Sequence, residues 1–390
     1  MATTASSDVV DNRATVNSSS NIKLVHPENE GGSSEHWLVV GDGDLSYSAS
    51  IAPELTSLNV KLIASVLESQ DEHHRVYERS VQNADTIASQ SPHDVQFGID
   101  ATNLPSHFPD CLFDCIEFNF PHWRGKTNNR YNRQLVDNFL KSAAQVLKPD
   151  GEIRISLCEG QGGMPGTTIE DWRRSWMPAM YAAEHGLLLR RIQPYQPSYG
   201  LSSHRGLDRP FWIGDAPQKY IFTLPNGEPV EETAQLSCRH ELRIVLHPDL
   251  IDESPVSRDD IVDGDAVYDI AKEFVPEGIR FELPARDLLT PQGTGTKSWH
   301  VPLAVFLLNY TGEQNPLTRS QADEIRSNIE AAIQERWKLE IAKAGRLVSK
   351  PYPYLLLPGL IREYSHSSVR RRDSSLDRRS HSPGSSSDTE

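Results

Sequence analysis

A turn of alternating glycine and aspartate follows an apolar run near the beginning of the chain. Residues 37–40 read Trp-Leu-Val-Val, and the next four are Gly41, Asp42, Gly43 and Asp44. A buried strand that runs into two glycines lets the backbone come close to a ligand. Asp42 and Asp44 would repel a pyrophosphate and attract a ligand that carries an ammonium and a sulfonium group. The turn favours S-adenosylmethionine over a dinucleotide, although glycine is also common in turns that bind nothing.

Two more carboxylates follow the next two apolar runs. Glu68 ends the run at residues 62–68, and Asp100 comes directly after residues 95–99. At the first position a carboxylate can accept both hydroxyl groups of a ribose, and at the second it can meet an adenine amino group. Either acid alone is most often a solvated loop residue. Because ligands bind at the carboxyl ends of parallel strands, three such strand ends in succession predict one cofactor site.

The fourth apolar run ends in residues suited to holding a nucleobase. After residues 115–118 come Asn119, Phe120, Pro121 and His122. The Asn119 amide can hydrogen-bond a base edge, Phe120 can stack on the base, and Pro121 stiffens the loop. His122 can receive a proton near neutral pH, or it can serve only to position the loop.

These residues need a parallel sheet to bring them together. Between residues 37 and 225, short β-rich runs alternate with segments of helical period, which is typical of a parallel α/β sheet with crossover helices. We predict helices at residues 132–147 and 169–185. We predict seven strands, at residues 37–40, 60–66, 95–99, 115–118, 152–157, 187–192 and 219–224.

Changes of composition divide the chain into segments. Residues 1–34 and 361–390 are rich in Ser and poor in apolar residues, so we expect a disordered head and a disordered Ser/Arg tail. Residues 35–225 form the first domain, and residues 226–236 read as a linker. The order predicted for residues 237–360 is strand, helix, strand, strand, helix, strand. That order matches the α+β ferredoxin-like arrangement.

Five motifs of the first domain together resemble a known family. GDGDLS, LIASVLES, GIDATNL, FNFPHWRG and GEIRISLCEGQGGMP occur in this order, as in the Rossmann-like (class I) methyltransferases typified by the yeast uridine-N(3) methyltransferases of large-subunit rRNA. The segment CEGQGGMPGTTIEDWRRSW is similar to the methyltransferase-like part of proteins with a ferredoxin-fold anticodon-binding domain. Residues 305–310 and 315–318 and the helix after them resemble the anticodon-binding domain of phenylalanyl-tRNA synthetases.

The family resemblance implies a role for each of the residues singled out above. Asn119, Phe120, Pro121 and His122 would face the target base. The residues that would contact S-adenosylmethionine or lie near its adenine are Gly41, Asp42, Gly43, Asp44, Glu68 and Asp100.

The distribution of charge bears on an RNA partner. The formal net charge of −15 argues at first against binding a polyanion. Residues 36–114 hold 3 basic and 12 acidic residues, whereas residues 115–225 hold 14 basic and 10 acidic ones. Arg124, Lys126, Arg130 and Arg133 follow the predicted acceptor loop directly, and we expect Arg124 and Lys126 to contact RNA. A solvated helix face is the alternative reading of these cations.

Composition also excludes some classes of protein. No run approaches the roughly 18 apolar residues of a membrane span. Four irregularly spaced cysteines suit neither a disulfide framework nor a metal site, so we expect no metal and a reducing compartment. The head lacks the features of a secretory signal. A nucleolar or cytoplasmic location is expected.

The predicted function is transfer of a methyl group from S-adenosylmethionine to N3 of a uridine, most consistent with structured rRNA. A tRNA substrate is an alternative, because the second domain resembles an anticodon-binding domain. A non-catalytic scaffold for RNA or protein is another alternative, because a fold does not by itself imply an activity. The sequence identifies no protein partner.

Overall fold

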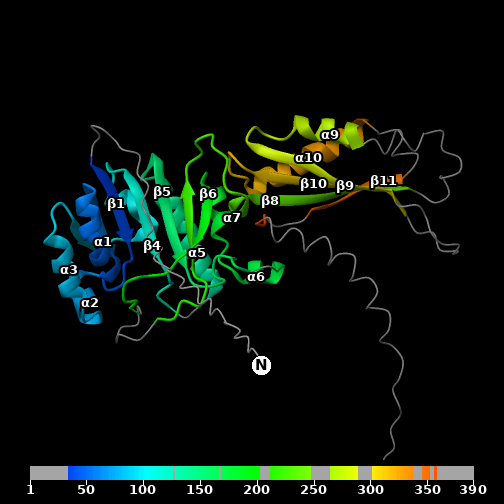
Figure 1. Cartoon of the computed structure of the whole chain (residues 1–390). Coiled ribbons are helices and arrows are strands. Elements are labelled where there is room, and N and C mark those ends of the chain that lie inside the picture. Colours follow the sequence, from blue (N-terminus) through cyan, green and yellow to red (C-terminus); the bar gives the residue numbers. More distant parts are fainter. Residues whose placement is uncertain are drawn as a thin grey trace, which may run out of the picture. The chain divides into compact units, whose positions relative to one another are not determined.

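The structure is a computed structural model of the 390-residue chain (Figure 1). It describes residues 34–125, 128–166, 168–202, 211–246, 264–288, 301–336, 345–351 and 355–357. The predicted tail, the predicted head except Ser34, and Lys126 lie outside these residues.

The first sheet has seven strands in the order β3-β2-β1-β4-β5-β7-β6. This confirms the predicted number of strands and the predicted Rossmann-like α/β class. The strands are β1 (Glu35–Val40), β2 (Val60–Val66), β3 (Asp94–Phe97), β4 (Phe113–Asn119), β5 (Leu147–Leu157), β6 (Leu188–Pro194) and β7 (Gln218–Thr223).

One strand runs against the direction that a parallel sheet requires. The neighbours β1 to β5 pair in parallel, but β7 pairs antiparallel with both β5 and β6. The predicted parallel arrangement therefore describes the sheet except at β7, whose direction was not predicted. An antiparallel strand needs no crossover helix, and the apolar pattern of a strand does not encode its direction.

Seven α-helices accompany this sheet in the described residues. They are α1 (Ser46–Ser57), α2 (Gln70–Val76), α3 (Ser80–Ala88), α4 (Leu104–His107), α5 (Asn129–Ala144), α6 (Ile169–Arg174) and α7 (Pro178–Glu184). The single helix predicted at residues 169–185 is thus two helices. Ser175 is extended and Met177 has φ 51°, so the first helix ends there, and Pro178 starts a new helix because proline suits the first helical position. No helix in the described part of the chain is long and apolar enough to cross a membrane.

Helices cover both faces of the sheet. Ala64 and Val66 of β2 pack with Leu45 and with Ile87 of α3, whereas Ile63 belongs to the core on the α5 side. Successive side chains of a strand point to opposite faces, so these contacts lie on opposite sides of β2.

The packing of α5 against the sheet follows from its apolar face. Val136, Phe139, Leu140 and Ala143 are buried on one side of this helix. The Phe139 ring meets Phe118 of β4 edge-on, with 5.1 Å between ring centroids. This edge-to-face contact between aromatic rings holds the carboxyl end of β4 against the helix.

The second sheet is antiparallel, in the order β11-β8-β10-β9. The predicted order of strands and helices matches the structure, and the ferredoxin-like classification stays a prediction. Ile325, Ile329 and Ile333 form the buried face of the longer helix. The elements are β8 (Leu236–Leu246), α9 (Gly264–Glu273), β9 (Ile279–Leu288), β10 (Val301–Gly312), α10 (Arg319–Arg336) and β11 (Gly345–Pro351).

A buried ion pair joins two strands of the first sheet across β5. The Lys219 Nζ of β7 lies 2.5 Å from Glu117 Oε1 of β4, and the two side chains are 9% and 0% exposed. Burial raises the pKa of Glu117, but the positive charges of Lys219 and Arg154 outweigh it and lower the pKa below its ordinary value. Glu117 is therefore ionised in the fold and depends on its cations.

Removing the charge of Lys219 alone should lower the stability of the fold far more than removing the charges of Lys219 and Glu117 together. We expect Lys219→Met to lower the free energy of unfolding by about 3–5 kcal/mol, because Glu117 would be left buried without its nearest cation. The pKa of Glu117 would rise in that variant, so the loss should grow as pH rises above the pKa of an unfolded glutamate. Urea unfolding of the full chain measures this, and Glu117→Gln/Lys219→Met is the matched control. A double variant as unstable as Lys219→Met would contradict the interpretation.

Candidate functional site

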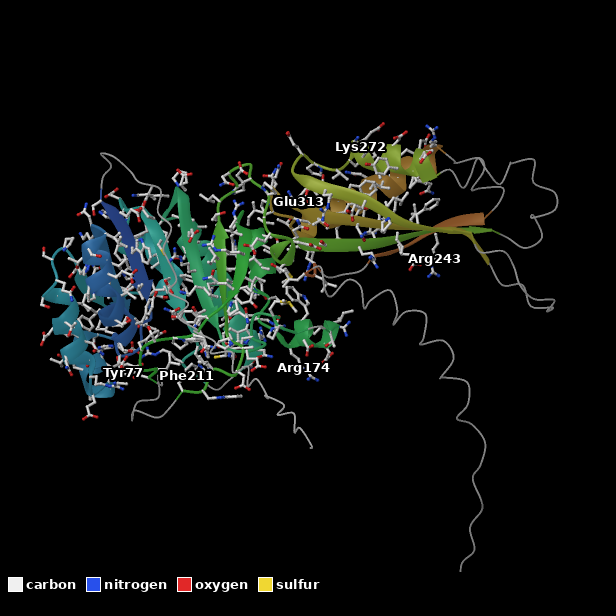
Figure 2. The ribbon with its side chains drawn as sticks, viewed as in Figure 1. Tyr77, Arg174, Phe211, Arg243, Lys272 and Glu313 are labelled. Atoms are coloured by element: carbon white, nitrogen blue, oxygen red, sulfur yellow. The ribbon has the colours of Figure 1, made fainter. Side chains whose placement is uncertain are left out.

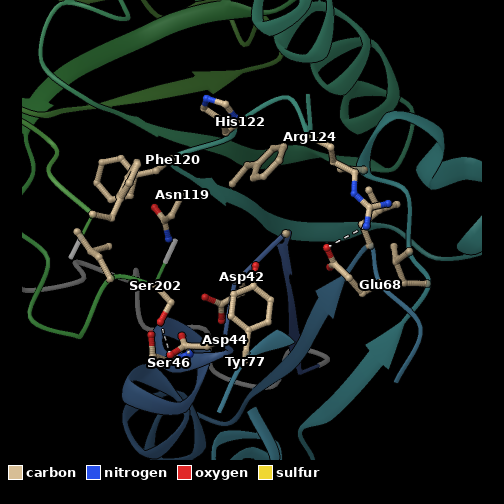
Figure 3. Close-up of a pocket in the computed structure, with 18 of the residues that line it drawn as sticks. Asp42, Asp44, Ser46, Glu68, Tyr77, Asn119, Phe120, His122, Arg124 and Ser202 are labelled. Atoms are coloured by element: carbon tan, nitrogen blue, oxygen red, sulfur yellow. Dashed lines mark hydrogen bonds and ion pairs between the residues drawn. The ribbon is translucent and has the colours of Figure 1, made fainter. Parts of the chain in front are cut away.

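A cavity of about 410 Å³ lies at the carboxyl ends of β1 to β4. Tyr77 and Phe211, which both line it, mark the same edge of the first sheet (Figure 2). Pro121 is buried but does not line the cavity. Ten of the twelve residues predicted for the site do line it: Gly41, Asp42, Gly43, Asp44, Glu68, Asp100, Asn119, Phe120, His122 and Arg124. Figure 3 labels all of these except Gly41, Gly43 and Asp100.

The two glycines of the first turn serve different purposes. Both have the positive φ that favours glycine, 60° at Gly41 and 40° at Gly43. A Cβ on Gly41 would lie 2.6 Å from Cε2 of Phe118, so the core requires glycine there. The nearest atom to a Cβ on Gly43 is the Ser202 carbonyl oxygen at 3.8 Å. Gly43 therefore borders open space that a ligand can enter.

Asp42 and Asp44 both accept hydrogen bonds from the beginning of α1. Asp42 Oδ2 accepts from the Ser48 amide at 2.8 Å, and Asp44 Oδ1 accepts from the Ser46 amide at 3.1 Å. Asp44 Oδ2 also accepts from the Ser202 hydroxyl at 2.6 Å. These carboxylates satisfy amides that a helix leaves unpaired at its first turn.

The pKa of Asp42 is raised to about 7. Burial is the main cause and the nearby charge of Asp44 adds to it, while hydrogen bonds from Ser48 oppose both. The Asp42 carboxyl group therefore exchanges its proton near neutral pH. A cation beside it would favour the charged form.

Several residues that line the cavity or support its wall were not predicted from the sequence. His73 of α2 is buried, and its Nε2 donates to the Gly43 carbonyl oxygen at 2.6 Å. Burial lowers the pKa of His73, so the ring is neutral at pH 7. Ser46 donates from its hydroxyl to the Gly200 carbonyl oxygen at 2.7 Å, which fastens residues 199–202 beside the turn. Nothing in the sequence connects His73 or residues 199–202 with the turn, because a short helix and a loop carry no hydrophobic period.

Glu68 and Arg124, predicted to bind different ligands, pair with each other. An Arg124 guanidinium nitrogen lies 3.4 Å from Glu68 Oε1 and 3.3 Å from Glu72 Oε1. The Arg124 side chain is 56% exposed, so this ion pair contributes little stability. Arg124 can exchange its partner at small cost.

Asp100 lies three residues beyond the end of β3 and caps a short 3₁₀ turn. Asp100 Oδ1 accepts from the amide of Thr102 at 2.8 Å and from its hydroxyl at 2.7 Å. These bonds fix the carboxylate at the cavity wall.

Asn119 at the end of β4 has an amide without a partner. Both polar atoms of its side chain are buried, and neither has a hydrogen-bond partner among the described residues. An unsatisfied buried polar group costs about 1–3 kcal/mol. The amide points into the cavity (Figure 3). A ligand with a complementary edge would satisfy it.

The residues after Asn119 form the rest of this wall. Phe120 has φ 50°, a strained value for a bulky residue. Its ring lies 5.8 Å from that of Tyr195 and 6.0 Å from that of Phe211. His122 Nδ1 donates to the Trp123 carbonyl oxygen at 2.6 Å. A neutral ring with its proton on Nδ1 carries its lone pair on Nε2, as a general base requires.

The predicted basic surface is only partly available. Arg133 donates to the backbone carbonyl oxygens of Arg173 and Ser175, so it fastens α5 to the end of α6. Arg130 is exposed in the first turn of α5. In the described residues no group of three or more His, Cys, Asp or Glu side chains could hold a metal ion.

Comparison with known proteins agrees with the family resemblance. Residues 38–200 match the family described as "BMT5-like: rRNA (uridine-N3-)-methyltransferase BTM5-like". This confirms the resemblance for that part of the chain.

Curated relatives match about half of the chain. The Ferredoxin-fold anticodon-binding domain-containing protein 1 homolog of Mus musculus is 35% identical over 196 residues, which are 48% of this chain and 30% of that protein. Heavy metal-associated isoprenylated plant protein 41 of Arabidopsis thaliana is 29% identical over 244 residues, 58% of this chain and 45% of that protein. The chain thus spans less than half the length of either relative.

Among solved structures, TrmN from Thermus thermophilus is similar with a TM-score of 0.32 and 16% identity. The match covers 49% of this chain and 44% of that chain.

The two glycines of the turn should differ in what they tolerate. We expect Gly43→Ala to lower stability by about 1–2 kcal/mol, the cost of a left-handed backbone at a residue with a Cβ. Gly41→Ala should cost clearly more, because its methyl group would also overlap the Phe118 ring. Thermal unfolding of both variants measures the difference. Equal losses would show that the Phe118 contact is unimportant.

Proposed function

We propose that the chain is an S-adenosylmethionine-dependent RNA methyltransferase that modifies N3 of a uridine in large-subunit rRNA. The observation that carries the proposal is the buried, unpartnered amide of Asn119 in the cavity wall. We take residues 35–225 as the catalytic domain and residues 237–360 as a ferredoxin-like domain. The family description of residues 38–200 supports rRNA as the substrate. Such a protein would act in the nucleolus or the cytoplasm.

The cavity fits S-adenosylmethionine in size and in chemistry. Its volume of about 410 Å³ lies in the range of small-molecule sites. Gly43 leaves room beside the turn, and Asp42 and Asp44 bring negative charge to a ligand with two cationic groups. Glu68 would accept the ribose hydroxyls, and Asp100 would lie near the adenine. When bound, the cofactor supplies an electrophilic methyl group.

The other wall of the cavity suits the edge of a uracil. Its N3–H donor lies between two carbonyl acceptors, and an Asn amide offers both an acceptor and a donor. Asn119 would donate from its amide nitrogen to a uracil carbonyl oxygen, which leaves the N3–H to His122, while Phe120 stacks on the ring. His122 Nε2 would take the N3 proton as the nitrogen attacks. Because this edge is occupied in a base pair, the target must be unpaired or flipped out.

Substitution of the two acceptor residues tests the reaction. We expect Asn119→Ala and His122→Ala each to lower the rate of methyl transfer to RNA by about 100-fold or more, the usual contribution of a general base or a positioned amide. Affinity for S-adenosylmethionine should stay within about twofold of the unmutated chain, since neither residue is assigned to the cofactor. Radiolabelled methyl transfer and titration calorimetry measure these two quantities.

Two outcomes would overturn this assignment. Full activity in both variants would remove Asn119 and His122 from the mechanism. No binding of S-adenosylmethionine by the unmutated chain would favour a non-catalytic scaffold.

The affinity for the cofactor should depend on the protonation of Asp42. A proton on this carboxyl group competes with a cationic ligand, and its pKa is about 7. We expect affinity to rise with pH up to about 7, by as much as tenfold per unit, and then to level. Calorimetry in buffers of different ionisation enthalpy should detect proton release on binding. Asp42→Asn can still accept from Ser48, and should bind weakly without this release; unchanged proton release in that variant would assign it to another group.

A further inference from the structure

Exposed aromatic side chains gather around the mouth of the cavity. Four aromatic residues of the described part of the chain are clearly exposed: Trp123, Tyr131, Trp212 and Tyr268. Trp123 lines the cavity directly, and the Tyr131 ring stacks on the Trp123 ring. Trp212 is 79% exposed and follows Phe211, which lines the cavity. Only Tyr268 lies elsewhere in the sequence, on α9 between two strands of the second sheet. A gathering of this kind indicates a binding surface.

Trp123 and Tyr131 form a flat two-ring surface, called here the aromatic platform. Their ring centroids are 5.3 Å apart and their planes differ by 20°, so the rings are stacked. The two residues are 40% and 41% exposed, so the pair is not core packing. Stacked aromatic rings open to solvent offer a face on which a further planar ring can stack.

The backbone beneath the platform is held from both sides. The Trp123 amide donates to Oδ1 of the buried Asn132 at 2.9 Å, and its carbonyl oxygen accepts from His122. A Cβ on Gly125 would lie 3.0 Å from Nε1 of Trp123, so glycine leaves room for the indole. The platform is thus organised before any ligand arrives, which reduces the entropy lost on binding.

The stretch of sequence that carries the platform is basic. Residues 118–136 contain four basic residues and no acidic one. Arg124 follows Trp123 in the chain and is 56% exposed, and Arg130 precedes Tyr131 and is exposed. Aromatic rings interleaved with arginines are the usual surface for single-stranded nucleic acid, where bases stack and cations meet phosphates.

We propose that the aromatic platform binds the base of an unpaired nucleotide next to the target uridine in single-stranded RNA. This inference rests on the proposed function, because it takes the cavity as the place of the target base. The platform continues the cavity wall from His122 through Trp123 to Arg124, so a strand whose target base enters the cavity passes over it. Stacking does not depend on the identity of the base, so the platform adds affinity for unpaired RNA and little sequence preference.

Removal of the indole tests the platform without disturbing the loop. Trp123→Ala keeps the backbone groups that contact Asn132 and His122. We expect this variant to bind a labelled oligouridine of roughly ten nucleotides about tenfold more weakly, and Trp123→Phe to keep most of the affinity. Tyr268→Ala, an exposed aromatic on α9, is the matched control and should bind as the unmutated chain does. Fluorescence anisotropy of the labelled RNA measures affinity in the full chain without cofactor.

The outcomes separate the platform from the proposed function. Equal affinity of Trp123→Ala and the unmutated chain would overturn the platform, even if methyl transfer occurs. Loss of affinity in Trp123→Ala together with the same loss for Tyr268→Ala would also overturn it, since the effect would not be local. An unmutated chain that binds oligouridine through Trp123 but transfers no methyl group would support the platform and contradict the proposed function.

Discussion

The first turn of α1 is the constraint on which the candidate site depends. A helix leaves its first amides without partners, and here Asp42 and Asp44 accept hydrogen bonds from two of them. The same two carboxylates lie in the cavity wall beside Gly43. The turn must therefore hold two acids close together, away from water, and still leave space for a ligand. The raised pKa of Asp42 is the electrostatic cost of that arrangement.

This constraint explains how an acidic chain can be suited to RNA. Four acids of the first half of the domain, Asp42, Asp44, Glu68 and Asp100, lie where parallel strands end, and three of them accept hydrogen bonds from backbone amides. The stretch after β4 holds cations and no acids. Net charge is thus a poor guide to the partner of a protein whose charges are separated along the chain. The Arg124–Glu68 pair lies where the two regions meet.

Much of this site follows from the sequence for a simple reason. Carboxyl ends of parallel strands share one edge, so a turn after β1 and acids or amides after β2, β3 and β4 must meet there. Gly41, Glu68 and Asn119 were found in this way. The direction of β7 could not be predicted in this way, because the apolar pattern of a strand is the same for a parallel and an antiparallel strand. The break between α6 and α7 occurs because Pro178 starts a new helix, and the periodic pattern of apolar residues does not reveal this break.

The missed residues share another property. Gly200, Ser202 and Phe211 reach the cavity from loops, and His73 of a short helix holds the Gly43 carbonyl oxygen; none of these segments carries a hydrophobic period. Their positions depend on contacts between distant parts of the chain, such as the Ser202 hydroxyl on Asp44. No local pattern encodes such a contact. Only a structure shows that they complete the wall.

The Phe118 ring connects the interior of the domain with the glycine turn. It packs edge-on against Phe139 of α5, and it occupies the space that any side chain at position 41 would need. Helix, strand and turn therefore share a single volume. In evolutionary terms, residues 41, 118 and 139 constrain one another. A larger residue at the turn becomes acceptable only after the ring behind it has become smaller. We expect relatives of this chain to change these three positions together or not at all.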